Sequence, residues 1–197
     1  MTKKLQAFFN NPKIKEKYLG QIEQHYKLDE IIHRIYWEDG KGCCVGCLVH
    51  SSDHKQFEIQ IGLPEWLAHL VDFLFENMNK GKAKEFPVQF IKSINVGTNY
   101  EIMYHEFIVF LLEQICKWNK EKHPDVTEAI STIINYHKKI VDTNDLDSVK
   151  DGEWSAAWSA AESAARSAAW SAAESAARST AVERIAEKLL ELLKKYD

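Results

Sequence analysis

Hydrophobic residues recur along most of this chain at the three- and four-residue spacing that places them on one side of a helix. The clearest case follows Gly62-Leu63-Pro64, because proline suits the first turn of a helix and an apolar stripe continues from there. The stripe consists of Leu63, Leu67, Leu70, Val71, Leu74, Phe75 and Met78. We expect this stripe in the core, with Leu70 and Leu74 buried.

Comparable patterns predict helices on both sides of this one. The predicted segments are residues 14–37 as one or two helices, residues 82–94 with a bend at Pro87, residues 99–118, and a last one that starts at His123-Pro124. Between Trp37 and Gly42, two glycines after an aspartate predict a turn. Only residues 54–61 alternate between apolar and polar positions as a strand does, and one strand cannot form a sheet. The sequence therefore predicts an all-α fold.

The composition divides the chain into three parts. Residues 1–147 are the predicted compact helical body, residues 148–152 a polar junction, and residues 153–197 one long alanine-rich helix. From Trp154 to Ala181 the chain follows the repeat x-Ser-Ala-Ala, which is rich in the strongest helix former. Beyond the repeat the spacing changes to a heptad-like apolar seam formed by Val182, Ile185, Leu189, Leu192 and Tyr196.

The length of the alanine-rich helix predicts self-association. About 44 helical residues span roughly 66 Å, whereas a compact body of about 150 residues is roughly 38 Å across. The part that overhangs carries either the tryptophans of the repeat or the seam, and neither should stay in water as a large apolar patch. We therefore expect a homo-oligomer that forms through the C-terminal helix.

Composition and charge limit the classes of function. A formal net charge of −4 disfavours nucleic-acid binding, which needs a cationic face. The longest apolar run, from Phe107 to Leu112, is far shorter than the roughly 20 residues of a membrane span. The segment after Met1 is too weakly apolar for a signal peptide. We expect a cytoplasmic protein, with no membrane partner, whose four cysteines are reduced.

The first candidate site is the set of Cys43, Cys47, His50 and His54. Thiolates and imidazoles are the preferred ligands of zinc, and the spacing C-x3-C-x2-H-x3-H lies within the usual range. A helix through this segment would place all four residues on one face, with Cys43 near the N-terminus as an activated nucleophile. Cysteine also occurs often as a small buried hydrophobic residue. The set is therefore a zinc site, a reactive thiol or a part of the core.

The second candidate site is a polar line on the helix after Pro64. It consists of Glu65, His69, Asp72 and Glu76, and its chemistry is repeated by the pairs Asp29 with His33 and Glu101 with His105. Carboxylates and histidines on facing helices can build a metal site or an acid/base pair. The same pairs are common on solvated helix faces, so this alternative stays open.

Residues 36–50 and 61–68 resemble a family of bacterial and phage proteins. The shared features are a Gly-Cys-x-Val-Gly-Cys motif at residues 42–47, a Gly-Ile-Pro-like helix start at residues 62–64, and an alanine-rich C-terminal tail. The resemblance covers residues 22–143 and the composition of the tail, and it implies no activity. The positions that it carries over are Trp37, Asp39, Gly42, Cys43, Gly46, Cys47, His50, His54, Asp72 and Glu76. Cys44 and His69 depart from the family pattern, which favours Cys43, Cys47 and His50 as the working set.

Two classes of function follow from these observations. The first is a non-enzymatic binding or interaction protein, with a small molecule or a protein bound at the helical body and an oligomerising C-terminal helix. A phage or host-defence factor that sequesters a small molecule between helices is one form of it. The second is a small metal- or thiol-dependent enzyme centred on Cys43, Cys47 and His50, with zinc as its cofactor and Asp72 or Glu76 as its acid/base.

Overall fold

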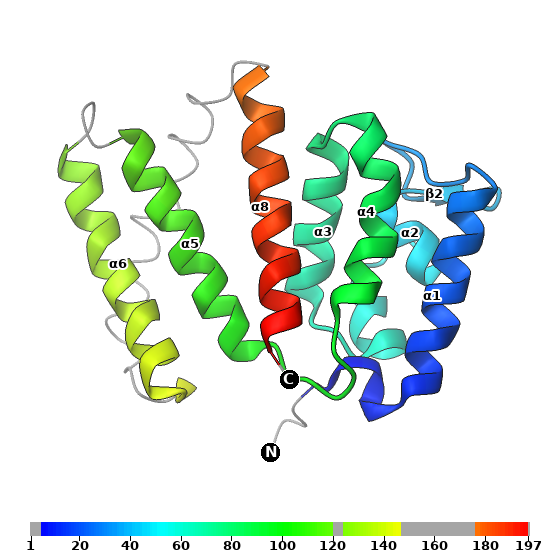
Figure 1. The fold of residues 1–197 in the computed structure, drawn as a ribbon, viewed down its shortest axis with the longest axis horizontal. Coiled ribbons are helices and arrows are strands. Elements are labelled where there is room, and N and C mark those ends of the chain that lie inside the picture. Colours follow the sequence, from blue (N-terminus) through cyan, green and yellow to red (C-terminus); the bar gives the residue numbers. More distant parts are fainter. Residues whose placement is uncertain (1–4, 120–123, 147–175, 197) are drawn as a thin grey trace. The chain divides into compact units, whose positions relative to one another are not determined.

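The computed structural model describes residues 5–119, 124–146 and 176–196 of the chain (Figure 1). Helices account for most of these residues. The strands described are one antiparallel pair of two residues each, β1 (Trp37–Glu38) and β2 (Lys41–Gly42). The predicted all-α fold is therefore confirmed. Within the described ranges, no helix is both long and apolar enough to cross a membrane.

The helices begin and end at residues with clear local reasons. Their bounds are η1 Ala7–Asn10, α1 Pro12–Lys27, α2 Cys44–Val49, η2 Phe57–Ile61, α3 Glu65–Asn77, α4 Lys80–Ser93, α5 Glu101–Asn119, α6 Pro124–Thr143 and α8 Ala176–Lys195. Asn11 caps α1 by accepting a hydrogen bond from the backbone N–H of Lys13 at 3.0 Å. Asn79 caps α4 in the same way through Gly81. Pro87 lies inside α4.

The chain divides into two compact units. Unit 1 contains residues 1–100 and 179–197, and unit 2 contains residues 101–178. The body predicted at residues 1–147 is thus shared between the two units, while the end of the predicted C-terminal helix belongs to unit 1. The predicted junction and residues 153–175 lie outside the described residues.

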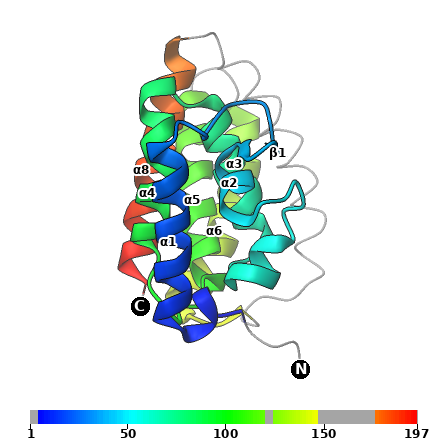
Figure 2. The ribbon, with the colours of Figure 1, turned by 90° about the vertical axis from the view of Figure 1, so that its right-hand side faces the viewer.

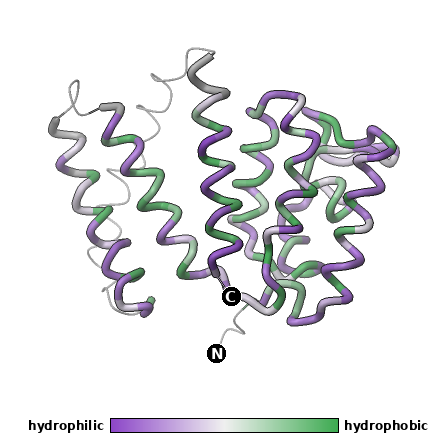
Figure 3. Tube along the Cα trace, in the orientation of Figure 1, coloured by the Kyte–Doolittle hydropathy of each residue, from purple (hydrophilic) through white to green (hydrophobic). Residues whose placement is uncertain are grey.

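In unit 1 the helices α1 to α4 pack together (Figures 1 and 2). Helix α1 lies beside α2 and α4, and α3 lies beside the same two helices. Figure 3 shows hydrophobic and hydrophilic residues alternating along these helices, as expected for helices with one buried side. The largest fully buried side chains of the unit include Phe8, Phe57, Phe75, Phe90, Leu48 and Leu67.

The apolar stripe of α3 is buried with one exception. The fully buried residues are Leu63, Leu67, Val71, Leu74 and Phe75. Leu70 is only half-buried, because it lies at the edge of the stripe. The predicted burial is therefore confirmed for Leu74 and wrong for Leu70.

Helix α8 confirms the predicted helix for residues 176–195. Its buried residues are Val182, Ala186, Leu189, Leu192 and Leu193. Glu183 of α8 pairs with Lys82 of α4 at 2.7 Å, and the Tyr100 hydroxyl donates to the Leu193 carbonyl oxygen at 3.3 Å. Most residues of the seam are already buried within this chain, so the seam gives no separate reason to expect packing against a second copy of the protein.

Residues 54–61 contain a helical turn, so the predicted strand is wrong. Helix η2 is one turn of π-helix in which Phe57 and Ile61 are buried, whereas Ile59 is 66% exposed. Residues four apart fall on roughly the same side of a helical turn. The first and last apolar residues therefore share the core and the middle one does not.

The helix predicted through residue 37 ends at Lys27. Asp29 and Arg34 have φ angles of +57° and +68°, which a right-handed helix cannot continue through. Residues 28–42 form a loop and the β1–β2 hairpin instead, with Gly40 at φ +80° in its turn. This loop carries half of the site described below.

Unit 2 contains α5 and α6, which pack against each other. Their hydrophobic cluster consists of Leu112, Ile130, Ile133 and Ile134. His105 Nδ1 lies 2.7 Å from His137 Nδ1 across the two helices, and Glu113 pairs with Lys138 at 2.7 Å. Burial lowers the pKa of His137 to about 4, so this histidine is neutral at physiological pH.

We predict that Leu74→Ala lowers the free energy of unfolding by about 2–5 kcal/mol, because it opens a cavity at a fully buried position. Leu70→Ala, on the same helix but half-buried, is the matched control and should lower it clearly less. Urea titration of both variants measures the difference. Equal losses would show that the two faces of α3 are assigned wrongly.

Candidate functional site

The Gly-Cys-x-Val-Gly-Cys motif forms the start of α2. Cys43 is the N-cap residue, and its Sγ accepts a hydrogen bond from the Gly46 N–H at 3.4 Å. The Cys47 thiol donates to the carbonyl oxygens of Gly42 and Glu30, at 3.3 and 3.6 Å. Both cysteines are buried. Their sulfur atoms therefore have partners in the local backbone.

Burial keeps the thiols of this segment protonated. It raises the pKa of Cys43 to about 12, opposed by the Gly46 N–H and reinforced by the nearby Asp72 carboxylate. Burial also raises the pKa of Cys47 to about 12 and that of Cys44 well above its usual value. The thiolate is the form that attacks substrates and binds metals. This environment is therefore typical of core cysteines.

His50 ends α2, and its ring contacts residues outside this helix. It is the C-cap residue and has a left-handed backbone conformation, with φ +49°. Its Nε2 lies 2.9 Å from His25 Nε2, and its ring stacks on Trp37 with 4.3 Å between centroids. His25 Nδ1 in turn lies 2.7 Å from a Glu30 carboxylate oxygen. His50 thus belongs to a hydrogen-bonded network with residues of α1 and the following loop.

His54 joins the polar line of α3 instead. Its ring stacks on His69 with 4.1 Å between centroids and an angle of 12°. Its Nε2 lies 3.8 Å from Asp72 Oδ2. The Tyr36 ring meets it edge-on at 5.8 Å.

The structure therefore separates the first candidate set into three environments. The spacing of Cys43, Cys47, His50 and His54 would place them on one face only along a continuous helix, and α2 ends at Val49. In the described part of the chain, no group of three or more His, Cys, Asp or Glu side chains is placed to hold a metal ion. The zinc site stays a prediction from spacing that this geometry does not support.

The polar line of α3 divides into an exposed end and a buried end. Glu65 pairs with His69 at 3.7 Å, and both side chains are exposed by more than a third. Asp72 and Glu76 lie one and two turns further on and line a pocket. The two candidate acid/base residues are therefore brought together, and the third candidate, Cys43, lies next to Asp72.

The Asp72 carboxylate is largely buried and only partly bonded. Its side chain is 14% exposed, and Oδ1 is buried without a hydrogen-bond partner among the described residues. The His54 Nε2 is also buried without a partner, because 3.8 Å is too long for a hydrogen bond. An unsatisfied buried polar group costs about 1–3 kcal/mol, and more when it is charged. The Asp72 Oδ1 therefore lacks a donor, although the carboxylate as a whole has a hydrogen bond with the Cys43 thiol.

A pocket of about 230 Å³ opens beside this carboxylate, and we name it the Asp72 pocket. It is lined by Arg34, Ile35, Tyr36, Asp72 and Glu76. The negative charge of Asp72, followed by burial, raises the pKa of Tyr36, so this phenol stays protonated. The pocket thus combines two carboxylates, a phenol, a guanidinium-bearing residue and one aliphatic side chain.

Glu76, unlike Asp72, has donors for both of its oxygens. They accept hydrogen bonds from the backbone N–H of Arg34 at 2.9 and 3.0 Å. A left-handed backbone costs a non-glycine residue about 1–2 kcal/mol, and this charge-assisted contact offsets the strain at Arg34. Glu76 therefore holds the loop onto α3.

Two glycines let that loop approach α2. A Cβ atom at Gly42 or Gly46 would overlap the Tyr36 carbonyl oxygen. The Cys43 N–H reaches the carbonyl oxygens of Ile35 and Tyr36, at 2.6 and 3.2 Å. The glycines of the motif thus fix the backbone that carries three of the five pocket residues.

Those three residues, Arg34, Ile35 and Tyr36, belong to neither candidate set. The sequence indicates these residues only indirectly. The glycines of the motif predict a close backbone contact, but they do not identify the residue that makes it. The predicted pair of Asp29 with His33 is absent from the site as well. Asp29 forms an ion pair with Lys84, and the His33 ring lies 4.6 Å from the Phe75 ring.

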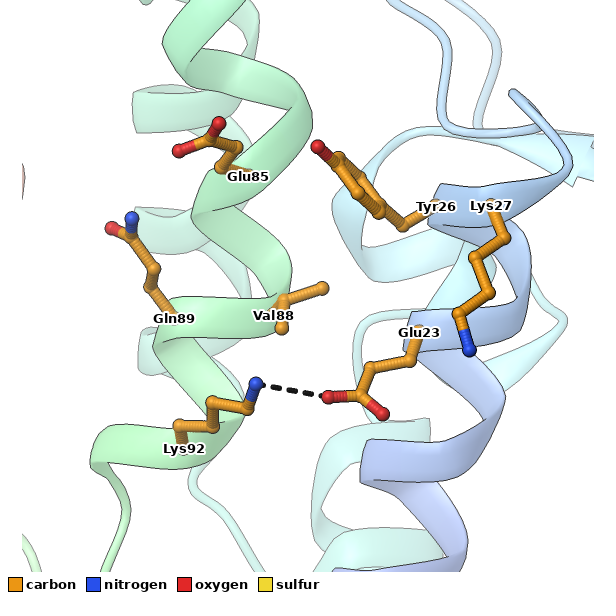
Figure 4. A pocket seen from close by; sticks show the side chains of 7 residues that line it. All are labelled: Glu23, Tyr26, Lys27, Glu85, Val88, Gln89 and Lys92. Atoms are coloured by element: carbon orange, nitrogen blue, oxygen red, sulfur yellow. Dashed lines mark ion pairs between the residues drawn. The ribbon is translucent and has the colours of Figure 1, made fainter.

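A second pocket, of about 430 Å³, lies between α1 and α4 (Figure 4). It is lined by Glu23, Tyr26, Lys27, Glu85, Val88, Gln89 and Lys92. Glu23 and Lys92 form an ion pair across it at 2.9 Å, and this bond lowers the pKa of Glu23. Of the two carboxylates in this groove, Glu23 already has its cation and Glu85 is exposed to solvent. The Asp72 pocket is therefore the stronger candidate site.

We predict that Gly46→Ala lowers the free energy of unfolding by about 1–3 kcal/mol, the usual cost of overpacking, because the new methyl group displaces the Tyr36 backbone. Gly20→Ala is the matched control. Nothing lies within 4 Å of a Cβ there, inside α1, so it should stabilise the protein by roughly 0.5–1 kcal/mol. Denaturant titration that finds the same effect for both would disprove the close contact.

We also predict that one cysteine of the four reacts with Ellman's reagent in the native protein. Cys116 is only partly buried, whereas the other three are buried and stay protonated. Cys116→Ser should abolish the native reaction, and all remaining thiols should react in denaturant. Rapid reaction of Cys43 in the folded protein would contradict the packing described here.

Comparison with known proteins found no matching family model, no similar curated protein and no similar solved structure. The function is therefore inferred from the geometry of the Asp72 pocket itself.

Proposed function

We propose that this chain is a non-enzymatic binding protein whose helical body takes a small molecule with a cationic hydrogen-bond donor into the Asp72 pocket. The observation that carries the proposal is the Asp72 carboxylate, which lines the pocket while its buried Oδ1 has no donor among the described residues. A ligand ammonium group in the pocket would supply a donor and the opposite charge to this carboxylate.

The charges around the pocket favour a cation. Asp72 and Glu76 contribute two negative charges, and Arg34 contributes one positive charge. His54 lies beside Asp72 but too far away to satisfy it. The pocket therefore keeps a net negative charge, which attracts an ammonium ion and repels a purely anionic ligand.

The volume of the pocket limits the ligand to metabolite size. With about 230 Å³ of space that opens to solvent, the pocket suits a small molecule better than a folded partner. The ligand class is therefore a small amine.

The thiol chemistry supports binding over catalysis. Cys43 is 1% exposed and its pKa is raised to about 12, so it offers no thiolate to a substrate at neutral pH. Glu76 is committed to the Arg34 backbone. The alternative, a metal- or thiol-dependent enzyme centred on Cys43, Cys47 and His50, has no comparable support from the geometry.

Two further parts of the proposal concern residues outside the site. Self-association through the alanine-rich segment rests on residues before Ala176, because the seam of α8 is used inside the chain. A cytoplasmic location, and a role in phage biology or host defence, stay predictions from the sequence.

The test uses propylammonium as the probe and 1-propanol as its uncharged analogue. We predict that propylammonium shifts backbone amide signals around the pocket in a titration followed by NMR, and that 1-propanol does not. Asp72→Asn should weaken the binding of propylammonium at least tenfold, since hydrogen bonds to charged groups contribute about 1.5–3 kcal/mol.

Glu65→Gln is the matched control, because it removes a carboxylate from the exposed end of the same helix. It should leave the affinity unchanged. The stability of Asp72→Asn gives an independent result. Removing an unsatisfied charge should leave the denaturation midpoint equal or higher, whereas a structural role for Asp72 would lower it. The proposal would be contradicted if propylammonium does not bind, or if Asp72→Asn binds it as tightly as the native chain does.

A further inference from the structure

Arg34 lines the Asp72 pocket, and its backbone is held by Glu76. Its N–H donates to both Glu76 oxygens, at 2.9 and 3.0 Å, and its φ is +68°. Glu76 is thus bound to the backbone of Arg34 and not to its side chain. Although two carboxylates line the same pocket, the Arg34 guanidinium forms no ion pair with either, or with any other described residue.

An arginine without an ion pair among the described residues and a carboxylate with an unsatisfied oxygen line the same pocket, and they offer two anchors of opposite sign. A guanidinium binds a carboxylate through two parallel hydrogen bonds, and a buried carboxylate oxygen binds an ammonium group. Ile35 and Tyr36 complete the lining with an aliphatic and an aromatic side chain. The arrangement therefore has a place for an ammonium, a carboxylate and an apolar group.

We propose that the ligand is a zwitterion of the α-amino acid class, with its ammonium group at Asp72, its carboxylate at Arg34 and an apolar side chain against Ile35 and Tyr36. This inference rests on the proposed function and names its ligand class. The net charge of the pocket favours a carboxylate over a phosphate as the anionic group of the ligand. The pocket has a net charge of −1 from Asp72, Glu76 and Arg34, so a neutral zwitterion is tolerated better than a ligand with a dianionic phosphate.

The test compares three probes that share one carbon skeleton. They are L-leucine, 3-methylbutylamine, which lacks the carboxylate, and 4-methylpentanoate, which lacks the ammonium group. We expect the native chain to bind leucine at least tenfold more tightly than the amine, and to bind the acid more weakly than either. Calorimetry or NMR titration measures the three affinities.

Arg34→Gln should bring the affinity for leucine down to that for the amine or below it, and should not weaken the binding of the amine, because the pocket becomes more negative. Arg34→Lys keeps the charge without the planar pair of donors. Its affinity for leucine should lie between the affinities of the native chain and of Arg34→Gln. Asp72→Asn should weaken both leucine and the amine. Lys41→Gln, which removes a positive charge from the same loop outside the pocket, is the matched control and should change nothing.

The two proposals fail in different ways. Equal affinity of the native chain for leucine and the amine, with no effect of Arg34→Gln, overturns the zwitterion and leaves the amine-binding function standing. Absence of binding by both leucine and the amine overturns the function itself. Tighter binding of 4-methylpentanoate than of the amine would reverse the assigned polarity and overturn both.

Discussion

The close contact between the Tyr36 backbone and α2 is the constraint on which the rest of the site depends. It requires that positions 42 and 46 have no Cβ atom, since a methyl group at either would overlap the Tyr36 carbonyl oxygen. With glycine there, the Cys43 N–H reaches two carbonyl oxygens of the loop. The loop is then fixed tightly enough to hold Arg34, Ile35 and Tyr36 against α3. Without this contact the Asp72 pocket would lose one of its two walls.

The same contact explains why the motif contains cysteines. Residues next to a backbone contact this close must be small and must tolerate full burial, and cysteine does both. The Cys43 and Cys47 sulfur atoms take backbone partners from Gly46, Gly42 and Glu30. In this position a thiol fills space and completes local hydrogen bonds. Its raised pKa is a consequence of that burial and has no need of a catalytic explanation.

Much of the fold could be predicted because helical periodicity is a local property. The stripe of α3 and the seam of α8 were identified from spacing alone, and most of their residues are buried. The failures come from backbone conformations that spacing does not report. Residues 14–37 were predicted to be helical, but the left-handed conformations of Asp29 and Arg34 prevent a helix from continuing to residue 37. The π-helical turn at Phe57–Ile61 has an apolar spacing that resembles the alternation of a strand.

The site could be predicted only in part for a related reason. Asp72 and Glu76 are one helical turn apart, so their common face follows from the sequence. Cys43, Cys47, His50 and His54 share a face only if the helix continues, and the left-handed conformation of His50 ends it. The loop residues that complete the pocket are more than 30 positions away from Asp72 and Glu76. Their place depends on a tertiary contact that no local pattern encodes.

Two features of the Asp72 pocket are unfavourable for folding alone. A buried carboxylate oxygen lacks a donor among the described residues, although an apolar residue at position 72 would avoid this cost. Arg34 adopts a left-handed backbone that glycine would adopt without strain. Both residues line one pocket of 230 Å³, which also contains the exposed loop residues Ile35 and Tyr36. The proposed ligand would supply the missing donor to Asp72, so a residue that is costly for the fold would serve binding.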